Sequence, residues 1–406
     1  MPNYLTPGVY VEEVSMGTRP IAAVGTSTAA LIGVAPNPNA HLNEAFACNS
    51  WSQFLKEFVP EGSAGTDLAR AVFGFFMNGG ARCYVLNVGQ NNPIAGDARA
   101  RTGLWALDAI DEVAIVAAPG YTDAGSYDAL LTHCERLGDR VAILDAPLEV
   151  DDVNSLKQVS SGEGSGGADE GDGKKPARGG QGRGMRPRNS DGGYGAFYFP
   201  WLVGRDPMDG LSQAKMPPSG HIAGIYARTD ATRGVHKAPA NESVRGAIGL
   251  TYALTRAEQG ELNSAGVNCI RFFPDAGIRV WGARTLADQA SEWRYVNVRR
   301  LFNMIEESIA QGTRWTVFEP NDFGLWQSVT RDVAAFLTLL WRDGALVGAT
   351  PAEAFFVKCD AETNPPEVVD AGRLVIEIGI APVKPAEFII FRIGQWAGGS
   401  EVQTAA

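Results

Sequence analysis

Val113-Ala114-Ile115-Val116-Ala117-Ala118 is followed by a helical stretch near Ser126–Leu137 and then by Val141-Ala142-Ile143-Leu144-Asp145. Two short, continuous apolar runs joined by a helix are typical of parallel strands that are buried on both faces. The same alternation extends outward, with further strands expected at 28–35, 82–88 and 195–203 and helices at 50–58, 67–78 and 221–229. The pattern predicts an α/β fold built on a parallel sheet.

The last third of the chain has longer helical periods and separate strands. Apolar residues recur every three or four positions in two stretches, which predicts amphipathic helices over about 288–311 and 322–343. Strand-like runs follow at 354–359, 373–381 and 387–393. This region therefore predicts a mixed α+β unit in addition to the α/β part.

Composition and charge exclude several classes of protein. The chain has 406 residues, a formal net charge of −11 and a pI near 5.0, and an acidic surface repels phosphate backbones, so we expect no nucleic-acid partner. The longest apolar stretch, around 336–341, is too short for a membrane span, so we expect no membrane insertion. Residues 1–10 lack a basic segment followed by an apolar one, so we expect no signal peptide.

The residues that usually carry chemistry are scattered. The four histidines and five cysteines show no metal-ligand spacing, and the cysteines suggest free thiols in a reducing compartment. The expected parallel strands are not followed by a glycine-rich phosphate loop. We therefore expect no catalytic residue, metal or cofactor, although the strand–helix alternation leaves a nucleotide-binding α/β enzyme as the alternative.

Residues 159–193 form a glycine-rich segment that is acidic in its first half and basic in its second. Such a segment buries too little apolar surface to order itself, so it is interpreted as a flexible surface loop. A surface that binds an acidic partner, as in an adhesin, is the other possibility.

Both ends of the chain contain strand-like runs that lack an evident partner. These are Leu5-Thr6-Pro7-Gly8-Val9-Tyr10-Val11-Glu12-Glu13 and Glu387-Phe388-Ile389-Ile390-Phe391-Arg392-Ile393. Each is apolar enough to need a neighbouring strand. Glu12 and Glu13 are either solvated or paired with basic residues of a neighbour, such as Arg299 or Arg300.

Several stretches together resemble one family, the tail sheath proteins of contractile phages, R-type pyocins and related contractile injection systems. In chain order the matching stretches are Leu5–Glu13, Pro217-Pro218-Ser219-Gly220-His221-Ile222-Ala223-Gly224, Ala227–Asp230, Arg233–Asn241, Trp281–Leu286, Tyr295–Leu301, Phe318–Asn321 and Pro385–Ile389. They are collinear and span nearly the whole chain. Each is weak alone, but together they are specific.

The resemblance implies a division into domains. Residues 1–20 would be an N-terminal linking arm. Residues 21–34 and 234–406 would form an inner core domain, with a C-terminal arm at about 385–396. Residues 35–233 would form an outer α/β insertion domain that carries the 159–193 loop.

The resemblance also implies a non-enzymatic function: a structural subunit that polymerises into a helical tube and contracts. Its two arms would add as strands to neighbouring subunits, with Leu374, Ile376, Ile378 and Ile380 as candidates for the accepting sheet. Implied partners are further copies of the chain, an inner tube protein, baseplate proteins and a tail-terminator or cap protein. Assembly would take place in the bacterial cytoplasm, as part of a phage tail or tail-like particle.

Overall fold

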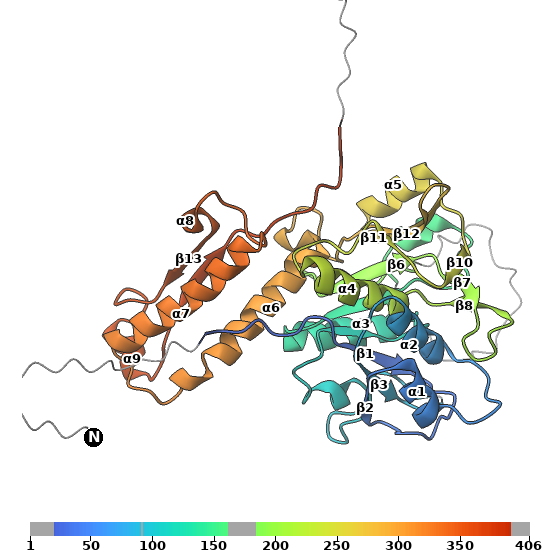
Figure 1. Ribbon diagram of the computed structural model, residues 1–406, viewed down its shortest axis with the longest axis horizontal. Helices are drawn as coiled ribbons and strands as arrows, with labels where there is room; N and C mark the ends of the chain where they lie inside the picture. The colour runs from blue at the N-terminus through green and yellow to red at the C-terminus, as the bar shows by residue number, and fades with distance from the viewer. Residues whose placement is uncertain (1–19, 91, 161–183, 391–406) are drawn as a thin grey trace, which may run out of the picture.

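A nine-stranded sheet forms the larger of two lobes in the computed structural model, which describes residues 20–90, 92–160 and 184–390 (Figure 1). In spatial order its strands are β2 (Ala45–Cys48), β3 (Cys83–Asn87), β1 (Ala29–Gly33), β4 (Ile115–Ala117), β5 (Val141–Asp145), β6 (Gly195–Phe199), β11 (Val267–Phe273), β12 (Gly277–Trp281) and β9 (Glu242–Ser243). From β3 to β11 neighbouring strands are parallel, and the outer strands are antiparallel. The predicted mixed α/β class is confirmed.

Helices cover both faces of this sheet. They are α1 (Trp51–Phe58), α2 (Asp67–Met77), α3 (Ala124–Leu137), α4 (Ser219–Arg233) and α5 (Arg256–Ser264), with short 3-10 turns at Gly103–Leu107 and Val153–Lys157. Alternate strand residues enter different cores: Leu31 lies in the core with α2 and α4, and Ile32 in the core with α3. The continuous apolar runs of the sequence therefore mark strands that are buried on both faces of the sheet.

A small antiparallel sheet extends this lobe. Its order is β10 (Ala247–Leu250), β7 (Leu202–Arg205) and β8 (Gln213–Met216). The sequence predicted one strand over 195–203, but the structure ends β6 at Phe199 and begins β7 at Leu202. Pro200 separates the two strands because its nitrogen carries no hydrogen for a strand ladder.

Helices α2 and α4 pack unusually closely. A Cβ added at Gly220 would collide with the backbone of Ala71, and one at Gly224 would collide with the backbone of Phe75. On the α2 side, Gly74 lies against the ring of His221. The glycines and histidine of the 217–224 stretch thus serve the contact between two helices.

The smaller lobe contains the long helices of the last third. Its elements are α6 (Val296–Gly312), α7 (Phe323–Arg342), α8 (Pro351–Ala354), β13 (Phe355–Lys358), α9 (Pro366–Asp370) and β14 (Glu377–Ile380), with 3-10 turns at Glu292–Arg294 and Arg314–Thr316. Helix α7 begins where predicted, because the Asp322 side chain accepts a hydrogen bond from the Leu325 amide. The predicted start of α6 near 288 is wrong, since a bridge between Arg284 and Tyr295 holds the preceding residues in a loop.

The nine-stranded sheet contains strands from all three predicted segments, 21–34, 35–233 and 234–406. Strand β1, expected in a core with 234–406, lies in the middle of the sheet formed by residues expected in the outer domain. Strands β9, β11 and β12 belong to the same sheet. The smaller lobe has its own core, which joins Ile21 and Val235 to α6 and α7. The strands of residues 35–233 pair with strands from both flanking segments, so one sheet crosses both predicted boundaries.

The prediction of a flexible loop over 159–193 is wrong at its C-terminal side. Arg186 is 7% exposed, and its guanidinium donates to the Ala265 carbonyl (2.8 Å) and to Asn189 Oδ1 (2.6 Å). Arg188 pairs with Glu135 at 2.9 Å, and Ser190 is fully buried. Part of the basic half of this segment is thus bound within the fold, and residues 161–183 lie outside the described structure.

Candidate functional site at the roots of the two chain ends

The N-terminal run Leu5–Glu13, with Leu5, Pro7, Gly8, Val9, Tyr10, Val11, Glu12 and Glu13, lies outside the described residues. What the structure describes is the root of that run, from residue 20 onward. Ile21 packs against Gly312 at the end of α6, and the Val24 amide donates to Ser308 Oγ at 3.0 Å. The root therefore lies along α6, where Figure 1 draws it as the dark-blue segment.

A buried ion pair holds the far end of this root. Arg300 of α6 donates to both carboxylate oxygens of Asp230 of α4, one of them at 2.9 Å. Thr26 Oγ1 donates to the same carboxylate at 2.6 Å, and Arg300 also donates to the Thr26 carbonyl at 3.0 Å. The side chains of Arg300 and Asp230 are only 3% and 6% exposed. The contact joins the N-terminal root, the sheet lobe and α6.

These contacts correct one sequence hypothesis. Arg299 and Arg300 were candidates to meet Glu12 or Glu13 of a neighbour, but both are buried and bound within their own chain. The Arg299 guanidinium lies 4.1 Å from the centre of the Trp293 ring and donates to Asn303 at 2.7 Å. Neither guanidinium is available on the surface for a neighbour's carboxylate.

The C-terminal run begins with a fixed residue and continues with exposed ones. Glu387 accepts hydrogen bonds from Arg284 Nε (2.8 Å), Arg284 Nη2 (2.7 Å), Asn263 Nδ2 (2.7 Å) and Tyr295 Oη (3.2 Å). Phe388, Ile389 and Ile390 are 72%, 73% and 79% exposed, and no strand is assigned to 387–390. Phe391, Arg392 and Ile393 lie outside the described residues.

The candidate accepting residues lie in or beside the two-stranded sheet of the smaller lobe. Ile378 and Ile380 belong to β14, which pairs with β13 from Phe355↔Ile380 to Lys358↔Glu377. Leu374 and Ile376 precede β14, and all four pack half-buried against the core around α7. Among the described strands, β13 and β14 pair only with each other, so each leaves one edge of backbone groups unpaired.

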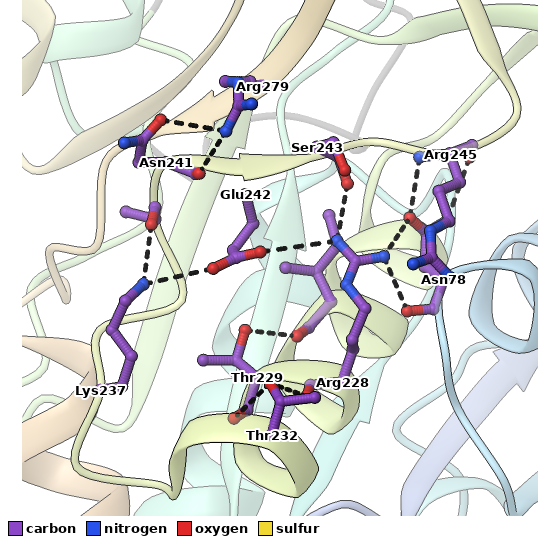
Figure 2. Close-up of polar contacts among 12 residues, drawn as sticks. Asn78, Arg228, Thr229, Thr232, Lys237, Asn241, Glu242, Ser243, Arg245 and Arg279 are labelled. Atoms are coloured by element: carbon purple, nitrogen blue, oxygen red, sulfur yellow. Dashed lines mark hydrogen bonds and ion pairs between the residues drawn. The ribbon is translucent and has the colours of Figure 1, made fainter. Parts of the chain in front are cut away.

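The 233–241 stretch that carried part of the resemblance forms a polar junction between α4, α2 and β9 (Figure 2). Lys237 Nζ donates to the Ala238 and Ala240 carbonyls at 2.6 and 3.0 Å. Arg228 donates to the Asn78 carbonyl at 3.0 Å and to the Ser243 carbonyl at 2.7 Å. Each of these two cations satisfies backbone oxygens, so the junction fixes a turn of the chain.

At the place where an α/β enzyme would bind a nucleotide, side chains lie close to the end of β1 and cap a helix N-terminus. Strand β1 has β3 on one side and β4 on the other, and such a reversal of strand order is the usual ligand position. At the end of β1, a Cβ on Gly33 would contact Leu68 and Tyr121. The N-terminus of α4, a potential anion site, is capped by Asp145, whose carboxylate accepts from the Ser219 amide and hydroxyl at 2.7 Å each.

The histidines do not form a site either. Within the described part of the chain, no group of three or more metal-ligating side chains is placed to hold an ion. His221 is fully buried and His133 is 4% exposed, and no ring nitrogen of either has a hydrogen-bond partner among the described residues. Burial lowers the pKa of both imidazoles to about 4, and the nearby Arg140 adds to the effect at His133.

These two histidines predict loss of stability in acid. Both imidazoles bind a proton more readily in the unfolded chain than in the folded one. Above pH 6.5 they are neutral in both states and cost no stability, and as the pH falls from 6.5 toward 4 the folded state loses stability. At pH 5 each should cost about 2 kcal/mol of unfolding free energy.

Urea unfolding at pH 7 and pH 5 would measure this loss, and the His133→Gln/His221→Gln double variant should lose less than the wild type. The control His41→Gln, at a partly exposed site, should keep the full loss, and a double variant that loses as much stability as the wild type would contradict the prediction.

No helix in the described parts of the chain is both long and apolar enough to cross a bilayer.

Two adjoining family models match the sequence. The phage tail sheath protein central domain matches residues 104–286, and the phage tail sheath C-terminal domain matches residues 288–395. Together they cover most of the chain and include the root of its C-terminal end.

Curated relatives are similar over less than half of this chain. The tail sheath protein of Vibrio phage KVP40 is 32% identical over 43% of this chain and 26% of its own length. A putative prophage major tail sheath protein of Pseudomonas aeruginosa is 30% identical over 45% of this chain and 47% of its own length. The chain thus spans about a quarter to a half of the length of these relatives in the matched regions.

Solved structures are similar over nearly the full length. The sheath of an extracellular contractile injection system, PVC, in its contracted state has a TM-score of 0.73 and 29% identity, covering 98% of this chain and 99% of the other. A chain of the anti-feeding prophage baseplate in its contracted state has a TM-score of 0.73 and 30% identity, covering 96% and 99%. Fold and sequence therefore agree on one group of proteins.

Proposed function

This chain belongs to the phage tail sheath protein family, and from that membership we propose that it polymerises into a helical contractile tube around an inner tube. In this proposal the subunits are linked by exchanged terminal strands, and contraction drives injection. The lattice would switch from a strained, extended packing to a more stable one, with the same subunit in both. The energy is then stored at assembly, and the chain needs no catalytic residue or cofactor.

One observation carries the proposal of strand exchange. The chain exposes the apolar residues Phe388, Ile389 and Ile390 while a two-stranded sheet in the smaller lobe keeps unpaired edges among the described strands. An exposed strand-like segment and an open sheet edge are the two halves of β-strand addition. Within one subunit, residues 387–390 form no strand and do not pair with β13 or β14. We therefore assign the donor and the acceptor to neighbouring subunits.

The accepting surface in this proposal is the β13–β14 sheet, with Leu374, Ile376, Ile378 and Ile380 on or beside β14. The donors are the N-terminal residues Leu5–Glu13 and the C-terminal residues Glu387–Ile393. Main-chain hydrogen bonds would supply the affinity, and alternate side chains would set the register.

The remaining partners follow from the same proposal. Baseplate proteins would contact the first ring of subunits, a tail-terminator or cap protein the last, and the inner tube protein the inside. Assembly would take place in the bacterial cytoplasm, as part of a phage tail or tail-like particle. We propose neither nucleic acid nor membrane as a direct partner. A nucleotide-binding enzyme is not favoured, because Leu68 and Tyr121 lie close to Gly33 at the end of β1 and Asp145 caps the N-terminus of α4.

Assembly of the purified chain tests this function. Full-length protein expressed alone should sediment as high-mass particles and should show rings or tubes by negative-stain microscopy. A chain that remains monomeric at every concentration, and that also fails to join particles when its inner tube and baseplate proteins are co-expressed, would contradict the proposal.

A further inference from the structure

We propose that Glu387 is a positioning residue for the C-terminal arm, held by a carboxylate clamp that consists of Arg284, Asn263 and Tyr295. The clamp fixes the point at which the arm leaves its own subunit, so that Phe388 is the first residue available to a neighbour. This inference rests on the proposed strand exchange, because only an exchanged arm needs a fixed point of departure.

Arg284 is held in place by bonds other than those to the carboxylate. Arg284 lies just beyond β12, where its amide donates to Asn268 Oδ1 and its carbonyl accepts from Asn268 Nδ2, both at 2.7 Å. Its Nη1 donates to the Asn263 carbonyl at 3.0 Å, and its side chain is only 8% exposed. An arginine held by its backbone and by one nitrogen presents the remaining two nitrogens in a fixed geometry for a carboxylate.

Four hydrogen bonds converge on the one carboxylate. Although partial burial opposes ionisation, the hydrogen bonds from Arg284 and Asn263 hold the pKa of Glu387 below its ordinary value. The carboxylate is therefore charged at neutral pH and matched by a buried cation. Charge-assisted, two-pronged pairs of this kind are stronger and more directional than the exposed ion pairs elsewhere on the surface.

The segment before Glu387 is also fixed, so the chain reaches the clamp along a defined path. The Val383 amide donates to the Ala345 carbonyl of the smaller lobe at 3.2 Å, and the Val383 carbonyl accepts from Asn297 of α6 at 3.2 Å. The chain then crosses to the sheet lobe, where the clamp holds Glu387. Figure 1 shows this segment running from the smaller lobe past the start of α6 before it leaves the body.

The contrast between Glu387 and the next residue locates the start of the arm. The Glu387 side chain is 20% exposed, whereas the residues from Phe388 to Ile390 are each more than 70% exposed. The sequence predicts Glu387 as part of the exchanged strand, but its carboxylate is bound within its own subunit. A fixed root restricts the directions that the arm samples, and so reduces the entropy lost when a neighbour binds it.

The experiment compares Glu387→Ala and Arg284→Ala with Lys384→Ala, which removes an exposed charge three residues before Glu387. For each full-length variant we would measure thermal unfolding, deuterium uptake of the peptide spanning 383–390, and the concentration needed for half-maximal assembly. Loss of charge-assisted hydrogen bonds should raise that concentration roughly tenfold to a hundredfold. Uptake by the peptide should rise, while Lys384→Ala should behave as the wild type in every assay.

A double variant separates positioning from general stability. If the two residues act as one clamp, Glu387→Ala/Arg284→Ala should assemble no worse than Arg284→Ala alone. Should Arg284→Ala fail to fold, Glu387→Gln, which removes only the charge, carries the test with a smaller effect in the same direction.

A chain truncated after Glu387 serves as the reference for the proposed function. If truncation blocks assembly but the clamp variants assemble and exchange as the wild type, the clamp is wrong; if truncation has no effect, strand exchange itself is wrong.

Discussion

A chain that lacks residues 1–14 is expected to fold but not to polymerise. In the proposed lattice each N-terminal arm contributes a strand to a neighbour, and each net main-chain hydrogen bond contributes about 0.5–1.5 kcal/mol. Five such bonds would amount to roughly 5 kcal/mol, or more than three orders of magnitude in association. Sedimentation and negative-stain microscopy would detect the loss, because the deletion should leave only small species at concentrations where the full-length chain forms tubes.

The deletion stops before the segment that holds the fold together. The described root starts at residue 20, and Ile21, Val24 and Thr26 keep their contacts with α6 and Asp230 in the shortened chain. Its melting temperature should therefore match that of the full-length protein. A matched control removes residues 163–181 of the glycine-rich segment and spares the buried Arg186; this variant should still assemble. Normal tubes from the chain without residues 1–14 would refute the linking role of the N-terminal arm.

Arg300→Ala is expected to destabilise the folded subunit by about 3–5 kcal/mol, because it leaves a buried carboxylate without its partner. Among the described residues, the Asp230 carboxylate would keep only the bond from Thr26 at 2.6 Å. The contact of the guanidinium with the Tyr226 ring, 4.7 Å from its centre, would also be lost. The N-terminal root would also lose the bond from Arg300 to the Thr26 carbonyl. Urea unfolding of the soluble subunit should show the loss as a lower midpoint with an unchanged slope.

Two further variants make the cause of that loss visible. Arg314→Ala removes an arginine that lies 3.7 Å from Asp111 at a site where both side chains are about two-thirds exposed, and it should change stability very little. Arg300→Leu combined with Asp230→Asn removes both charges, and it should be more stable than Arg300→Ala alone because no unpaired charge remains. Equal effects of Arg300→Ala and Arg314→Ala would show that burial of the pair does not matter.

Most of the sheet could be predicted from local sequence, and the reason is visible at β1, β4 and β5. Each is a continuous apolar run because one set of side chains faces α2 and α4 while the other faces α3. The hairpin of β11 and β12 was missed, although the turn residues Pro274-Asp275-Ala276, followed by Gly277 at the start of β12, were a usable signal. The start of α6 could not be predicted, because a bridge between Arg284 and Tyr295 prevails over a helical pattern.

The sequence by itself determined most of the buried parallel strands, among them β1, β4 and β5, and also where α7 begins and which family the chain resembles. It also predicted a strand-like run over Glu387–Ile393 that lacks a partner strand in its own chain. Only the tertiary structure decided which charges pair. Asp230 lies beside Arg233 in the sequence but bonds to Arg300, 70 residues away, and Glu387 bonds to Arg284 across 103 residues. The physical reason is that hydrophobic periodicity acts over a few residues, whereas a buried charge takes the partner that the folded chain brings within about 3 Å.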